Sequence, residues 1–216
     1  MTALLRYHTA LLVRSQRWLA PFLLYCAFLV VGVRPGEPVL GALGYAVAGL
    51  LPVTGWAVRI CLHQEPSAAR TVVAAAAGRR RTHAAAVLAA TGCAGLVGTV
   101  TALAVTAVSD LRGAGPLEAG AAGLLGASVC VLTGAAVGTL SSRPFLHARG
   151  LSLATLVLGS LLALLTRGSP AERAVTSLVT GSHTATVHLP WLPLAGALAL
   201  MAATVTLSCR ATAWRE

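Results

Sequence analysis

Ser128 is the residue whose setting could support catalysis inside a membrane. It ends the sequence Gly-Ala-Ser within a long apolar run, where a serine hydroxyl could act as a nucleophile if a base stood beside it. Such a serine needs a base within hydrogen-bond reach to take its proton. No histidine lies in the middle of any apolar run, and His188 stands only at the edge of the last one. We therefore interpret Ser128 as a small side chain at a helix contact.

The histidines and cysteines lack the spacing of a metal or redox site. His183 and His188 are close in sequence, but no carboxylate or cysteine near them completes a ligand set. His63, His83 and His147 fall in expected cytoplasmic loops and receive no role. The five cysteines form no Cys-x-x-Cys pair and are expected to pack as small apolar side chains: Cys26, Cys61, Cys93, Cys130 and Cys209. We expect no metal, no cofactor and no enzymatic activity in this chain.

All sixteen basic residues are arginine, and the sequence contains no lysine. A phosphate-binding loop of the form G-x-x-x-x-G-K-[ST] requires its lysine, so this chain cannot bind ATP by that route. The exclusive use of arginine, together with abundant alanine and glycine, indicates a GC-rich bacterial genome. We therefore expect the protein in a bacterial plasma membrane.

The composition is that of an integral membrane protein. Hydrophobic residues make up 56% of the 216 positions, charged residues 10%, and the mean hydropathy is +0.80. A soluble domain carries about a quarter charged residues. The charged residues of this chain are too few to cover the surface of a water-soluble globule. The apolar runs show no alternation with a period of two, so they are expected to be helices with internally satisfied backbones. The prediction is a single all-α transmembrane domain over residues 1–216.

Six apolar runs are long enough to cross a bilayer, which takes about 20 helical residues for about 30 Å. They extend over residues 18–33, 39–60, 82–108, 117–140, 150–165 and 189–209. Because segments with excess arginine stay in the cytoplasm, the distribution of charge gives the orientation. With both termini cytoplasmic, the inner segments carry the whole net charge of +10, and the four outer arginines are balanced by four acidic residues.

Three segments outside these runs also show helical patterns. Residues 1–17 place leucines on one face and arginines on the other, which predicts an interfacial helix on the inner leaflet. The cytoplasmic loop 61–81 predicts a short helix that begins near Pro66 and is capped by Gly78. The outer loop 166–190 contains Ser169 and Glu172 at capping-box spacing, with Gly181 as the expected helix end.

Two further clusters have alternative interpretations. Arg79, Arg80 and Arg81 lie at the cytoplasmic mouth of the third run, where anionic headgroups favour them. Nucleic acid is an unfavourable partner, because no aromatic stacking platform or binding motif accompanies the arginines. Gly134 and Gly138 form a small-xxx-small pair that permits close helix approach, either within the chain or between two copies.

The arrangement resembles the permease subunit of type-2 ABC transporters. The resemblance covers nearly the whole chain and is one of architecture: an amphipathic entry helix, six spans with both ends inside, a cytoplasmic helix between spans two and three, and an outer helix before span six. It implies that the loop 61–81 contains a coupling helix, which docks on a cytoplasmic ATPase subunit. The candidate ATPase contacts are Glu65, Arg70, Arg79, Arg80 and Arg81.

The resemblance further implies that the partner subunit binds ATP. It also implies that two permeases, identical or related, frame the pathway among membrane lipids. The absence of ionisable groups at depth suits a hydrophobic or amphipathic cargo. The alternative from another functional class is a non-transporting membrane scaffold or assembly partner.

Overall fold

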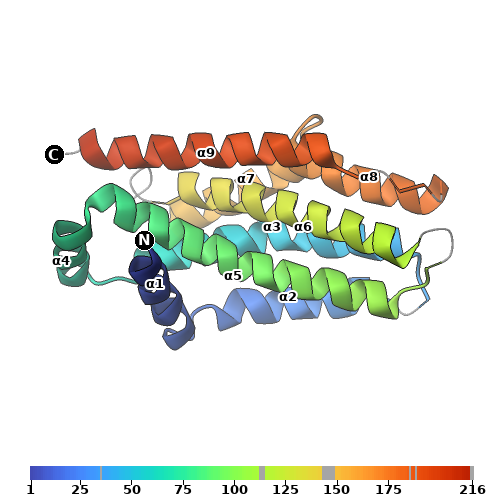
Figure 1. The fold of residues 1–216 in the computed structure, drawn as a ribbon, viewed down its shortest axis with the longest axis horizontal. Helices are drawn as coiled ribbons and strands as arrows, with labels where there is room; N and C mark the ends of the chain where they lie inside the picture. The colour runs from blue at the N-terminus through green and yellow to red at the C-terminus, as the bar shows by residue number, and fades with distance from the viewer. Residues whose placement is uncertain (35, 112–114, 143–148, 185, 188, 215–216) are drawn as a thin grey trace.

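The computed structural model describes all residues except 35, 112–114, 143–148, 185, 188 and 215–216 (Figure 1). The described residues form nine α-helices and no strand; their only bridge-type pairing joins Pro38 and Asp110. The helices are α1 (Thr2–Arg14), α2 (Leu19–Gly32), α3 (Val39–His63), α4 (Ser67–Ala77), α5 (Arg79–Val108), α6 (Pro116–Leu140), α7 (Arg149–Leu165), α8 (Pro170–Thr184) and α9 (Trp191–Trp214). The prediction of an all-α multi-pass membrane protein is confirmed.

By length and composition, four helices can each cross a membrane: α3, α5, α6 and α9. Two bent pairs raise the number to as many as six if each pair is one span: α1 with α2, bent by 72°, and α7 with α8, bent by 51°. Helices α6 and α9 both run towards the end that holds the chain termini (Figure 1). The chain between them returns along α7 and α8, which supports counting that pair as one crossing.

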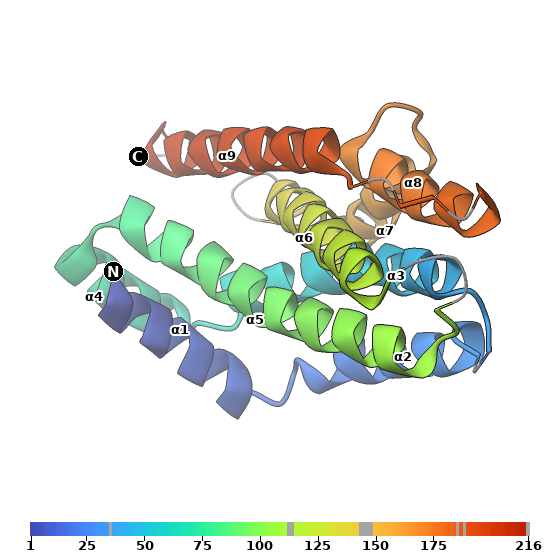
Figure 2. The same ribbon diagram turned by 45° about the vertical axis from the view of Figure 1, so that its right-hand side comes forward.

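Both termini lie at one end of the helical bundle, and α4 lies at the same end (Figures 1 and 2). At the opposite end, the segment before α3 joins the end of α5. There the backbone nitrogen of Val39 donates to Asp110 O at 3.1 Å, and Asp110 N donates to Glu37 O at 3.1 Å. The placement of the termini agrees with the even number of crossings that the charge distribution predicts.

Helices α3 and α6 form the centre of the bundle and pack along each other with small residues between them. A Cβ atom on Gly134 would lie 2.3 Å from Leu51 O, and one on Gly138 would lie 2.6 Å from Gly55 O. Such distances leave no room for any side chain, so glycine permits the close backbone approach. Both glycines therefore face α3 of the same chain. The helix α3 continues without interruption through Pro52.

The sequence placed residues 166–190 in an outer loop, but α8 forms the second half of the bent pair with α7. Helix α8 begins with the predicted cap. The backbone nitrogen of Glu172 donates to Ser169 Oγ at 3.3 Å, and Gly168 N donates to Glu172 Oε2 at 3.2 Å. The prediction that Gly181 ends this helix is wrong, because α8 continues to Thr184. Gly181 is instead buried against the returning chain, where a Cβ atom would lie 2.6 Å from Thr186 O.

Candidate docking surface

The helix α4 is joined to its neighbours by short, well-defined turns. Pro66 is the N-cap of α4, and Gly78 is its C-cap with φ +85°, a conformation that glycine adopts without strain. The next helix, α5, starts at Arg79, directly after that glycine. Pro66 and Gly78 thus act as the sequence predicted, and the single linking residue fixes α4 at the end of the bundle.

One face of α4 is apolar and exposed. Val72 is 69% exposed, and it lies on the helix beside three exposed alanines. We call these four residues the α4 apolar stripe: Ala68, Val72, Ala75 and Ala76. Their spacing of four, three and one residues gathers them on one side of the helix. Among the described helices, α4 packs only on α5, so the stripe is open to a partner of apolar character.

Glu65, one of the expected ATPase contacts, is turned into the chain. Its side chain is only 6% exposed, and Oε1 accepts a hydrogen bond of 2.9 Å from the hydroxyl of Tyr7 in α1. Arg70 Nη2 donates to Glu65 O at 2.8 Å. Partial burial, together with the bond to Glu65, raises the pKa of Tyr7 above its ordinary value. Glu65 and Arg70 therefore connect α1, the end of α3 and α4.

The three arginines of the cluster are exposed and form the first turn of α5. The span was expected to begin at Thr82, but the helix starts three residues earlier, at Arg79. Cations at a helix N-terminus oppose the helix dipole, whereas cations beyond a C-terminus complement it. Arg79, Arg80 and Arg81 follow the C-terminus of α4, where cations are favoured, but they also stand at the N-terminus of α5, where cations are not. They follow the apolar stripe in sequence, and all three are exposed.

Two histidines that were assigned to loops lie in helices. His63 is in the last turn of α3, and its Nδ1 lies 2.8 Å from Arg59 O. His83 is in α5, and its Nε2 lies 3.0 Å from Ser208 Oγ in α9. The hydroxyl of Ser208 also donates to Val205 O at 2.9 Å, which leaves it free to accept from the imidazole. His83 therefore joins α5 and α9 near the end of the bundle that holds α4.

Arg59 connects three helices near the end of the bundle that holds α4. Its Nε donates to Ser152 Oγ at 2.9 Å, and Ser152 Oγ donates to Ser141 O at 2.6 Å. The three residues belong to α3, α7 and the end of α6. Sequence patterns gave no sign of this network, because its members are far apart in the chain and two of them are ordinary serines.

The side chains that the sequence singled out for possible chemistry are not gathered into a metal site in the part of the chain that the structure describes. No group of three or more His, Cys, Asp or Glu residues there could hold a metal ion. Ser128 is exposed, and its hydroxyl donates to Leu124 O in its own helix at 2.8 Å. It lies on an outward face of α6 rather than at the expected helix contact. His147 and His188 lie outside the described residues.

The comparisons with known proteins assign no family. No protein-family model matches this chain, and no curated protein or solved structure shows significant similarity to it. The chemistry of the surface itself is thus the basis for a functional assignment: an exposed apolar stripe and three exposed arginines at one end of a multi-pass helical bundle.

Proposed function

We propose that this chain is the membrane-spanning permease subunit of an ABC transporter, and that α4 receives the movement of a separate ATPase subunit. The observation that supports the proposal is α4 itself. It is too short to span a membrane, it is held between two spanning helices, and it leaves the α4 apolar stripe uncovered beside Arg79, Arg80 and Arg81.

The connections of α4 suit it to transmit a displacement. Gly78 is the single residue between α4 and α5, and Glu65 joins the start of α4 to α1 through Tyr7. A push on α4 therefore reaches α5 directly and α1 through a hydrogen bond. In the proposed cycle, the partner binds and hydrolyses ATP, and its closure alternates the access of the pathway between the two sides of the membrane.

This chain would contribute positioning and a pathway but no catalytic group. Among the described residues, the buried ionisable side chains outside the tyrosines and cysteines are His8 and Glu65, and both belong to the connection around α1. A pathway lined by apolar and small residues would offer little to a charged cargo and would suit a hydrophobic or amphipathic one. Two such subunits, identical or related, would frame the pathway.

The proposal is tested by purifying tagged protein from its native membrane in a mild detergent. We expect a co-purifying protein with a G-x-x-x-x-G-K-[ST] loop and measurable ATP hydrolysis. The substitution Val72→Glu and the replacement of Arg79, Arg80 and Arg81 by alanine should each reduce both signals. The matched control is Leu117→Glu, because Leu117 is also exposed and apolar but lies at the opposite end of the bundle.

Recovery of intact, folded protein with no ATP-hydrolysing partner would contradict the transporter assignment. Equal loss of the partner in the Leu117→Glu control would contradict the role of α4 in docking. A stable complex with membrane proteins that lack a phosphate-binding loop would favour the scaffold alternative.

A further inference from the structure

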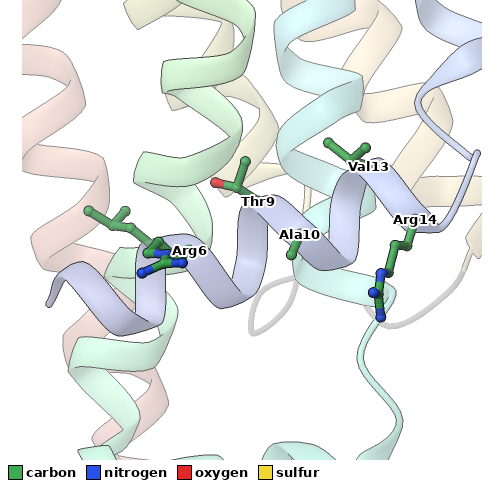
Figure 3. Close-up of a pocket in the computed structure, with 6 residues that line it drawn as sticks. Arg6, Thr9, Ala10, Val13 and Arg14 are labelled. Atoms are coloured by element: carbon green, nitrogen blue, oxygen red, sulfur yellow. The ribbon is translucent and has the colours of Figure 1, made fainter.

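The outward side of α1 carries a shallow, open cavity of about 520 Å³, lined only by residues of α1 itself (Figure 3). It is lined by two neighbouring rows of side chains, each with a spacing of four residues: Leu5, Thr9 and Val13 in one row, and Arg6, Ala10 and Arg14 in the other. Residues four apart lie one above the other on a helix. The cavity therefore has one largely apolar edge and one edge with two cations.

Ala10 separates the two cations of the basic row. Arg6 and Arg14 are two helical turns apart, about 12 Å along the axis, and only the small side chain of Ala10 lies between them in this row. Neither guanidinium has a hydrogen-bond or ion-pair partner among the described residues. The cavity is thus suited to an anion with several oxygen atoms, such as a phosphate, which arginine binds with two parallel hydrogen bonds.

The opposite side of α1 is fixed to the bundle. His8 is 1% exposed and Leu12 is 4% exposed, and both belong to the face that packs against the rest of the chain. Tyr7 adds the hydrogen bond to Glu65. These contacts set the rotation of α1 about its own axis, so the cavity faces outward because of the fold and not through the freedom of a terminal helix.

The direction of α1 relative to the spans suits a position of the cavity at a membrane surface. The axis of α1 makes an angle of 72° with α2, so α1 lies across the direction of the bundle. Thr9 and Val13 point the way in which the spans extend, whereas Ala10 and Arg14 point the opposite way (Figure 3). An interfacial helix needs this arrangement, with apolar side chains toward the acyl region and cations at the level of the headgroups.

We propose that this cavity is a binding site for one anionic phospholipid. Its phosphate lies over Ala10 between Arg6 and Arg14, and the upper part of an acyl chain lies along Leu5 and Val13. A free phosphate ion would use only the basic row and would leave the apolar row in water, so the two rows together favour a lipid. The proposal is independent of the transporter assignment, since it requires only a membrane protein.

The test uses delipidated, purified full-length protein titrated with phosphatidylglycerol or phosphatidylcholine, with binding measured by native mass spectrometry. We expect the wild-type protein to bind phosphatidylglycerol at least about tenfold more tightly than phosphatidylcholine, because each arginine near an anionic headgroup contributes about 1 kcal/mol. The double variant R6Q/R14Q should lose that preference. The control R167Q/R173Q removes the same charge from exposed positions away from α1 and should keep it.

A third variant, Leu5→Gln, separates lipid from free anion, since it should weaken phospholipid binding without changing the binding of inorganic phosphate. Equal affinity for the two lipids in the wild-type protein would overturn the proposal, as would an unchanged preference in R6Q/R14Q. Inorganic phosphate that displaces the lipid completely, with no effect of Leu5→Gln, would show a simple anion site instead. All three substituted side chains are exposed or partly exposed, so circular dichroism should confirm that each variant folds.

Discussion

The hydroxyl of Tyr7 donates a hydrogen bond of 2.9 Å to Oε1 of Glu65, across 58 positions of sequence. This bond joins the first helix to the turn that leads into α4. We predict that Tyr7→Phe weakens the attachment of α1 by about 0.5–1.5 kcal/mol, the usual net value of one hydrogen bond. Hydrogen exchange of residues 2–14 should then be faster. Glu65→Gln, which keeps an acceptor oxygen, should have the smaller effect, and equal exchange in Tyr7→Phe and wild type would contradict the prediction.

Attachment of α1 should also depend on pH through His8. Burial lowers the pKa of His8 below its ordinary value of 6.5, and the carboxylate of Glu65 opposes that shift. A lowered pKa means that the attached state binds fewer protons than the detached state. The attachment is therefore fully stable above pH 6.5 and weakens as the pH falls below it.

The measurement is hydrogen exchange of α1 at pH 7.5 and pH 5.5, corrected for the intrinsic dependence of exchange on pH. The wild-type protein should lose protection at the lower pH, whereas His8→Phe should show no such loss because its side chain does not titrate. Identical protection of the wild-type helix at both values would show that protonation of His8 does not control the attachment.

The glycines of α6 allow a sharp test of the bundle centre. Gly134→Ala and Gly138→Ala would each place a Cβ atom against the backbone of α3, at 2.3 Å and 2.6 Å from a carbonyl oxygen. Backbone cannot move aside as a flexible side chain can, so each should lower stability by about 1–3 kcal/mol or more. Gly92→Ala in α5 is the control, since a Cβ atom there meets nothing within 4 Å.

The control should be neutral or should stabilise the protein by about 0.5–1 kcal/mol, because alanine is the better helix former. Thermal unfolding in detergent measures all three variants. A Gly134→Ala protein as stable as the Gly92→Ala protein would contradict the close packing of α3 and α6.

Local features of this fold could be predicted from the sequence, whereas the contacts between helices could not. Spans, the limits of α4 and the cap at Ser169 follow from local chemistry, namely apolar length, proline, glycine and a capping hydroxyl. Gly92 and Gly134 stand in similar small-residue patterns, yet one faces open space and the other faces a carbonyl oxygen. The difference depends on which helix lies opposite, and that information is not local.

The candidate docking surface could likewise be predicted only in part. The exposed arginines and the position of α4 were predictable, because a basic cluster and a capped helix are both encoded within a few residues. The inward direction of Glu65 and the burial of His8 depend on α1 folding back past the end of α3. That fold-back uses a bend after α1 in which Gln16 has φ +53°. This conformation is uncommon for residues other than glycine, so the sequence of the segment did not predict the bend.

We predict the orientation of the chain in the membrane from the distribution of its arginines. The excess of arginine at the end with α1 and α4 should keep both termini and α4 in the cytoplasm. Epitope tags at residue 1 and residue 216 should be protected in intact cells and reached after permeabilisation, and a tag inserted at residues 113–114 should be reached without it. Termini on opposite sides of the membrane would contradict the charge argument and the crossing made by α7 and α8.

The most direct test of the account is contact between α4 and an ATPase in the native membrane. A photo-crosslinking amino acid placed at Val72 should form a covalent adduct, and mass spectrometry should identify in it a protein with a G-x-x-x-x-G-K-[ST] loop. The same amino acid at Leu117 should give no such adduct. An adduct from Val72 that contains only lipid, in cells where the Leu117 protein is equally abundant, would contradict the assignment of α4 as the site of coupling.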